Sequence, residues 1–126
     1  MIKIALTTTA IGLAMCVAAA AETTKWSATE TNAVGIKSAS GTWVLNNEGG
    51  KVTGTASMQF DNGKTLEYKL DGTAEGEVYT VNLVDRTDDK KNCVWTGKPA
   101  AAGGRVLNGD VKCDNSKFSI RAGLQQ

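Results

Sequence analysis

The chain has 126 residues, with 14 Lys plus Arg against 13 Asp plus Glu and a formal net charge of +1 at pH 7, which suits one modest domain. This balance removes the usual electrostatic argument for binding nucleic acid or an anionic membrane surface. The chain contains no histidine, which excludes Ser-His-Asp and Cys-His catalytic groups and histidine metal clusters, so we expect neither an enzyme nor a bound metal or cofactor.

Residues 1–21 have the parts of a secretory signal peptide. Lys3 supplies the positive region, residues 4–17 the apolar stretch, and a run of alanines the cleavage site. Cleavage there would leave residues 22–126 with no net charge and no transmembrane segment, located in the periplasm or secreted. The alternatives are an uncleaved membrane anchor and a lipid anchor on Cys16, whose preceding residues resemble a bacterial lipoprotein box.

Residues 22–39 are predicted to form a polar N-terminal arm. The arm has a possible first strand at residues 33–37, with Val34 and Ile36 facing inward. Trp26 lies in the polar part, where it either caps one open end of the domain or is exposed as an anchor for a protein partner. The second role is considered because tryptophan is favoured at binding hot spots.

From Gly41 onward the chain alternates between apolar and polar residues in short segments separated by Gly, Asn and Asp, which is typical of antiparallel strands. The clearest segment is KVTGTASMQF, residues 51–60. One face of that segment carries Val52, Gly54, Ala56, Met58 and Phe60. Seven such segments lie between Gly41 and Gly123.

The register of the hairpins follows from keeping apolar faces together, because a one-residue slip moves a whole strand to the wrong face. Around a three-residue loop ending in Gly63, the rule places Met58 opposite Leu66 and Ala56 opposite Tyr68. The other predicted facing pairs are Tyr68 with Val81, Leu70 with Tyr79, Val81 with Trp95, Tyr79 with Gly97, Trp95 with Val111, Gly97 with Gly109, and Trp43 with Gly54.

Cys93 and Cys113 are the cysteines that remain once Cys16 is removed with the signal peptide. An even number of cysteines in an exported chain indicates a disulfide. Zinc would need about four ligands, and the spacing is not that of a C-x-x-C redox motif. We therefore predict one disulfide across neighbouring strands, where facing Cβ atoms are within bonding reach.

These patterns predict an all-β domain over residues 40–126. The expected architecture is a single small antiparallel up-and-down barrel of about seven or eight strands, because closure leaves no strand edge exposed. A flattened β-sandwich is the alternative.

Two short motifs carry a family resemblance. Gly41-Thr42-Trp43 and the later Val94-Trp95-Thr96-Gly97 resemble the avidin and lipocalin-like (calycin-type) barrels, which are secreted and bind small ligands inside. Gly41, Trp43 and Leu45 are also similar to the G-x-W-x-L start of the secreted metalloprotease inhibitors of Gram-negative bacteria. The first resemblance implies a small apolar ligand; the second implies a protein partner that is contacted through the N-terminal arm.

The inner aromatic residues are the candidate ligand wall: Trp43, Tyr68, Tyr79 and Trp95. Ordinary core packing is the alternative, because an eight-stranded barrel is barely wide enough for side chains or one small ligand. The charged run DRTDDKK, residues 85–91, is expected to be a solvated hairpin loop, with a weak calcium site as the other interpretation.

We therefore predict a non-enzymatic exported β-barrel that binds either a small apolar ligand or a protein partner. One alternative is a periplasmic protease inhibitor that acts through its N-terminal arm. The other is a structural protein of the cell envelope.

Overall fold

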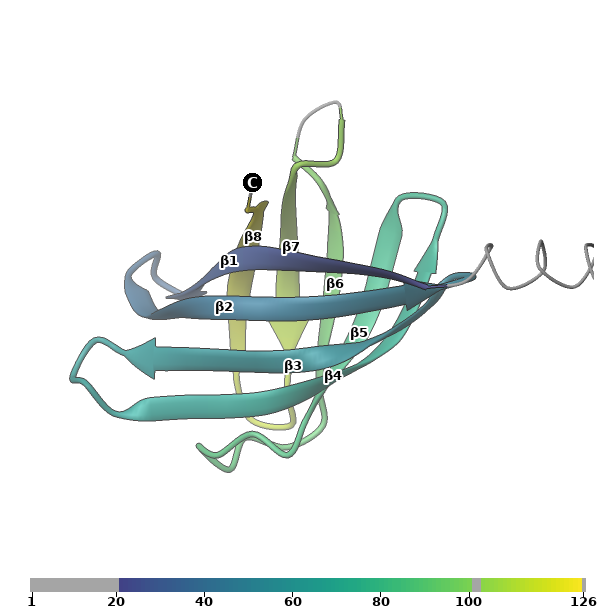
Figure 1. Cartoon of the computed structure of the whole chain (residues 1–126). Coiled ribbons are helices and arrows are strands. Elements are labelled where there is room, and N and C mark those ends of the chain that lie inside the picture. The colour runs from purple at the N-terminus through teal and green to yellow at the C-terminus, as the bar shows by residue number, and fades with distance from the viewer. Residues whose placement is uncertain (1–20, 101–102, 126) are drawn as a thin grey trace, which may run out of the picture.

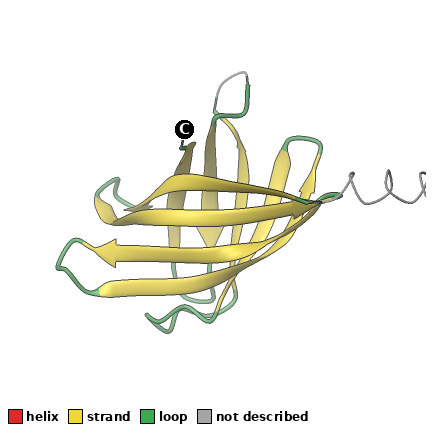
Figure 2. Ribbon diagram, viewed as in Figure 1, coloured by secondary structure: helices red, strands yellow, loops and turns green. Residues whose placement is uncertain are grey.

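The computed structural model describes residues 21–100 and 103–125. The predicted signal peptide, apart from Ala21, and the alternative lipid site at Cys16 lie outside these residues. Eight strands account for most of the described chain (Figures 1 and 2). They are β1 (Glu22–Asn32), β2 (Lys37–Glu48), β3 (Lys51–Phe60), β4 (Thr65–Glu75), β5 (Val78–Val84), β6 (Cys93–Pro99), β7 (Val106–Lys112) and β8 (Lys117–Leu124).

The strands form one closed antiparallel barrel in sequence order, which confirms the predicted fold class in place of a sandwich. Each strand pairs with its neighbour in the chain, and β1 also pairs with β8 to close the barrel. In Figure 1 the strands β1 to β4 cross in front of β6, β7 and β8. The described part of the chain holds no helix that is long and apolar enough to cross a membrane.

The polar arm predicted for residues 22–39 is wrong. Residues 22–32 are strand β1, which is hydrogen-bonded on both sides, and residues 33–36 form the turn to β2 instead of a first strand. Val34 in that turn is 78% exposed, so it does not face inward as expected. Closure explains the difference: without β1, β2 and β8 would each present an unpaired edge.

Six predicted pairings agree with the observed register. Ala56 faces Tyr68 across β3 and β4, and Trp95 faces Val81 on β5 and Val111 on β7. The remaining confirmed pairs are Met58 with Leu66, Tyr79 with Gly97, and Gly97 with Gly109. Matching the apolar faces was therefore sufficient to predict the register of these hairpins.

Three other predicted pairings are wrong. In the β4–β5 hairpin, Tyr79 faces Ala74 instead of Leu70, and Val81 faces Gly72 instead of Tyr68, because a tight turn at Gly76 (φ 63°) lets both strands continue further. Trp43 faces Ala56 instead of Gly54. Each displacement is an even number of residues, so every side chain stays on its predicted face.

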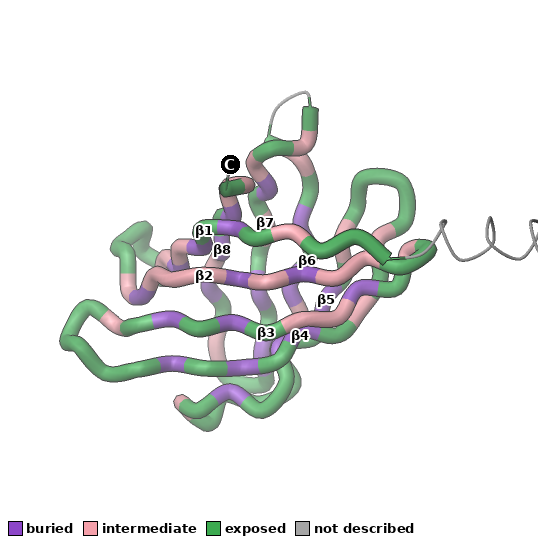
Figure 3. Tube along the Cα trace, in the orientation of Figure 1, coloured by how far each residue is buried: buried purple, intermediate pink, exposed green. Residues whose placement is uncertain are grey.

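The barrel interior is filled by inward-facing side chains, as the alternating burial along each strand shows (Figure 3). The largest fully buried side chains are Trp43 and Trp95. Gly97 lies under the Trp95 ring: a Cβ atom at this position would come within 2.3 Å of the indole carbons. The indole therefore occupies space that only a glycine leaves free.

The predicted disulfide is confirmed. Cys93 and Cys113 are joined with an S–S distance of 2.03 Å and a sequence separation of 20 residues. Replacing both with alanine is expected to lower the free energy of unfolding by about 3 kcal/mol, because the unfolded chain gains the freedom of the opened loop. Urea denaturation checks the value, and adding a reductant to the natural chain should reproduce it. Equal stability of the natural and double-alanine chains would contradict the prediction.

Candidate functional site

Three of the four predicted ligand-wall aromatics pack against one another at the centre of the barrel. Trp43 lies edge-on to Trp95, with ring centroids 5.0 Å apart, and edge-on to Tyr68 at 6.4 Å. The Trp95 Nε1 donates a hydrogen bond of 3.1 Å to the Ile120 carbonyl oxygen. These rings supply large buried apolar areas, and edge-to-face contacts of this kind add to their stabilisation.

Tyr79, the fourth of these aromatics, is only partly buried. It lies 6.3 Å from Trp95 and lines a hollow of about 200 Å³ at the barrel end that carries Glu22. Burial raises its pKa, and the Glu22 carboxylate raises it further. The role of the four aromatics as ligand contacts stays a prediction.

Trp26 also lines that hollow, and the prediction that it is an exposed anchor for a partner is wrong. The side chain is 5% exposed, and its Nε1 donates to the Thr24 hydroxyl at 2.8 Å. The alternation of Trp26, Ala28 and Glu30 along β1 turns all three toward the interior. The polar residues between them face outward, and their number led to the prediction of a polar arm instead of a strand.

A hydrogen-bonded chain leads from the aromatic centre to the other end of the barrel. Trp43 Nε1 donates to the Tyr68 hydroxyl at 3.0 Å, and that hydroxyl donates to Glu30 Oε2 at 3.1 Å. Burial raises the pKa of Tyr68 well above its ordinary value, and the neighbouring Glu30 charge adds to the rise. Tyr68 therefore keeps its proton and holds the buried carboxylate.

Arg86 is the cation that neutralises Glu30. Its Nη1 and Nη2 donate to the two Glu30 carboxylate oxygens at 3.0 and 3.3 Å, and its Nε and Nη2 donate to the two Asp88 oxygens at 3.0 and 2.7 Å. The guanidinium lies over the rings of Tyr68, 4.8 Å from the centroid, and Phe118, at 5.0 Å. Its side chain is 0% exposed. This is a bidentate, desolvated geometry that lysine cannot reproduce.

The two acidic partners shift the pKa of Arg86 upward. Burial alone would lower it, but the hydrogen bonds and charges of Asp88 and Glu30 prevail. Burial alone would likewise raise the pKa of Asp88, and the hydrogen bond and charge of Arg86 lower it instead. Arg86 and Asp88 therefore both stay charged at neutral pH.

The expectation that residues 85–91 form a solvated loop is wrong for Arg86 and Asp88. The segment folds back against the barrel, where Thr87 N donates to the Glu67 carbonyl oxygen at 3.0 Å and the Thr87 hydroxyl accepts from Glu67 N at 3.0 Å. Asp85 and Asp89 have positive φ angles of 56° and 65°, which aspartate tolerates better than most residues. Among the residues described, no three acidic or cysteine side chains gather as a metal site.

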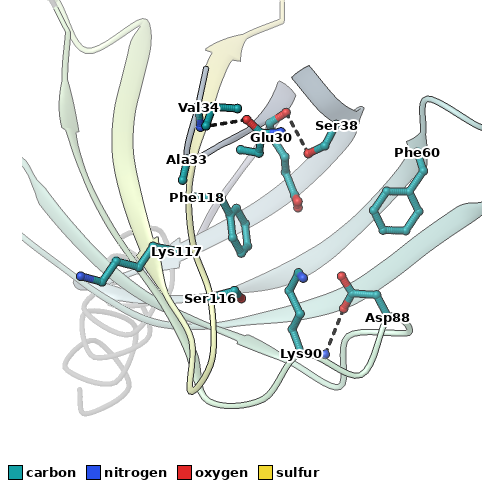
Figure 4. A pocket seen from close by; sticks show the side chains of 11 residues that line it. Glu30, Ala33, Val34, Ser38, Phe60, Asp88, Lys90, Ser116, Lys117 and Phe118 are labelled. Atoms are coloured by element: carbon teal, nitrogen blue, oxygen red, sulfur yellow. Dashed lines mark hydrogen bonds between the residues drawn. The ribbon is translucent and has the colours of Figure 1, made fainter. Parts of the chain in front are cut away.

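A pocket of about 530 Å³ lies at this same end of the barrel, which we call the pocket end (Figure 4). The pocket end is formed by the turns and loops of residues 33–36, 61–64, 85–92 and 113–116. Phe60 from the end of β3 and Phe118 from β8 face the hollow from opposite sides, and the Glu30 side chain lies between them in this view. Its other lining residues are Asn32, Ala33, Val34, Ser38, Asp88, Lys90, Ser116 and Lys117.

This pocket was not predicted from the sequence. The predicted ligand wall consists of the central aromatics, whereas Phe60 and Phe118 belong to the ends of strands. One signal was available: both residues follow the inward-facing alternation of their segments, and both stand next to a turn. Apolar side chains at these positions point toward an open barrel end, where side chains from the opposite strands no longer cover them.

The comparisons with known proteins concern the fold. No protein-family model matches the chain, and no curated protein matches its sequence. Among solved structures, a de novo designed fluorescence-activating β-barrel aligns with a TM-score of 0.58 at 13% identity, over 81% of this chain and 92% of that one. A redesigned barrel, mFAP1, bound to DFHBI, gives a TM-score of 0.59 at 16% identity, over 82% and 93%. A second redesigned barrel gives a TM-score of 0.61 at 15% identity, over 82% of this chain and 90% of that one.

Proposed function

We propose that this protein is an exported, non-enzymatic barrel that binds a small, largely apolar molecule in the pocket at the pocket end. The observation that carries the proposal is the pair of facing rings, Phe60 and Phe118, across a hollow of about 530 Å³. Ligand pockets in proteins have this size and combine apolar walls with a few polar groups.

The packing behind the pocket favours binding at little conformational cost. Phe118 is held by the Arg86 guanidinium beneath its ring, and Arg86 is fixed in turn by Glu30 and Asp88. A wall that is already ordered loses little freedom when a ligand arrives, so more of the contact energy remains as affinity.

Two further observations support the proposal. One of the similar structures, the redesigned barrel mFAP1, is bound to the small molecule DFHBI, so a barrel of this general shape accommodates such a ligand. Export is supported by the Cys93–Cys113 disulfide, because such bonds persist in oxidising compartments. The inhibitor alternative that used an N-terminal arm is not part of the proposal, since residues 22–32 are a barrel strand.

The test uses N-phenyl-1-naphthylamine, an uncharged probe whose fluorescence rises in apolar surroundings. Phe60→Ser should weaken binding of the probe about tenfold, because the ligand loses an aromatic wall worth roughly 1.4 kcal/mol. Phe60 is suitable because it is only partly buried and makes no contact with Arg86 like that of Phe118. Fluorescence titration of the folded chain gives both dissociation constants.

Val78→Ser is the matched control. Val78 is an exposed apolar residue at the start of β5, at the opposite end of the barrel from the pocket. This substitution should leave the affinity unchanged. If the probe fails to bind the natural chain, or if both variants weaken it equally, the pocket is not the binding site.

A further inference from the structure

The charged groups at the pocket end differ in how far they are neutralised. The carboxylates of Glu30 and Asp88 both accept hydrogen bonds from Arg86, so they are occupied from within the protein. Lys90 and Lys117 also line the pocket, and among the described residues neither forms a salt bridge. Glu30, Asp88, Arg86, Lys90 and Lys117 together carry one net positive charge.

Lys90 is the cation that points inward. In Figure 4 its side chain extends from the β5–β6 loop into the hollow, between Phe118 and Phe60, whereas Lys117 extends away from it. The backbone N of Lys90 donates to Asp88 Oδ1 at 3.2 Å, which fixes the base of the side chain to the ordered part of the loop. The ammonium group therefore lies beside the aromatic walls, and within the described residues it forms no salt bridge, although its charge helps to lower the pKa of Asp88.

We infer that the ligand is a small amphipathic monoanion, with an apolar body between Phe60 and Phe118 and a carboxylate or sulfonate group on the Lys90 ammonium. This inference rests on the proposed function and adds the ligand class to it. An uncharged ligand would leave the Lys90 charge unpaired over an apolar wall. A cation would meet the ammonium directly, and the carboxylates that could attract it are already bound to Arg86.

The experiment compares two probes that differ in one group. N-phenyl-1-naphthylamine is uncharged, and 8-anilino-1-naphthalenesulfonate is the same aromatic body with a sulfonate. Lys90→Gln should weaken binding of the sulfonate probe about fivefold, the effect of a partly exposed ion pair, and change binding of the uncharged probe less than twofold. The measured quantity is the ratio of the two dissociation constants in each variant.

Lys91→Gln is the control, because Lys91 is the neighbouring exposed lysine of the same loop and does not line this pocket. The same change in net charge there should leave the ratio unaltered. If both probes bind but the ratio is unaffected by Lys90→Gln, or changes equally in the two variants, the inference fails and the proposed function stands. If neither probe binds the natural chain, the proposed function fails, and the inference fails with it.

Discussion

Replacing Arg86 with methionine is expected to lower the free energy of unfolding by about 3–5 kcal/mol, because it leaves a buried carboxylate without a partner. Glu30 is 2% exposed, and its two oxygens accept from Arg86 at 3.0 and 3.3 Å. Tyr68 would remain as a donor to Glu30, but one neutral hydroxyl does not balance the charge. Urea denaturation followed by tryptophan fluorescence measures the loss.

The double variant Glu30→Leu with Arg86→Met separates the cost of an orphaned charge from the value of the pair. Removing both charges together replaces the ion pair with apolar groups of similar length, a change that is often neutral or stabilising. We therefore expect the double variant to be more stable than Arg86→Met alone. The stability of Arg86→Lys should lie between those of the natural chain and Arg86→Met, since the positive charge remains but the paired hydrogen bonds of the guanidinium to Glu30 and Asp88 are lost. A loss below about 1 kcal/mol for Arg86→Met would contradict the buried pair.

Replacing Trp95 with alanine is expected to cost about 3–5 kcal/mol, through lost burial and the cavity left at the barrel centre. The indole is fully buried and contacts both Trp43 and Tyr79. Its Nε1 also donates to the Ile120 carbonyl oxygen, which would lose this partner. The free energy of unfolding from urea denaturation checks the value.

Gly97→Ala provides the paired measurement. On its own the added methyl group should cost about 1–3 kcal/mol, because it would lie within 2.3 Å of the Trp95 ring. In the Trp95→Ala background the same substitution should cost much less, since the ring that it meets is gone. A double-mutant cycle gives the coupling between the two positions. Additive effects would mean that the indole does not occupy the space above Gly97.

The buried ion pair joins parts of the chain that are distant in sequence. Glu30 and Arg86 are 56 residues apart, and their contact ties β1 to the β5–β6 loop across the pocket end. Because Arg86 also lies over Phe118, the same side chain supports one wall of the proposed ligand pocket. Stability and binding are therefore coupled here, and substitutions at Arg86 should be assayed for folding before their effect on affinity is interpreted.

Much of the fold could be predicted from local pattern. Alternation placed Trp43, Tyr68 and Trp95 inside the barrel, and matching of apolar faces set the β3–β4, β5–β6 and β6–β7 registers correctly. The positions of the turns were harder to predict from the sequence. The length of a strand also depends on how far a tight turn lets the hydrogen-bonded pairing of its two strands continue. The β4–β5 hairpin, which turns at Gly76, shows this limit.

The candidate site was less predictable. The inward position of Glu30 follows from the alternation with Trp26 and Ala28, but only once residues 22–32 are accepted as a strand. A glutamate on the inner face is then expected to have a buried cation as its partner, because an unpaired buried carboxylate is unfavourable. Nothing in the local sequence distinguishes Arg86 from the lysines beside it, since all of them stand in one charged loop.

The sequence by itself determined the seven strands from Gly41 onward, their inward faces and the disulfide, because period-two alternation and cysteine pairing are local or nearly local properties. Only the tertiary structure decided that residues 22–32 close the barrel, since a strand of mixed polarity becomes favourable when both neighbours need a partner. The tertiary structure also decided the burial of Arg86, because a charged side chain is buried only where folding brings groups of opposite charge to it. Glu30 and Asp88 supply those charges from two different parts of the chain.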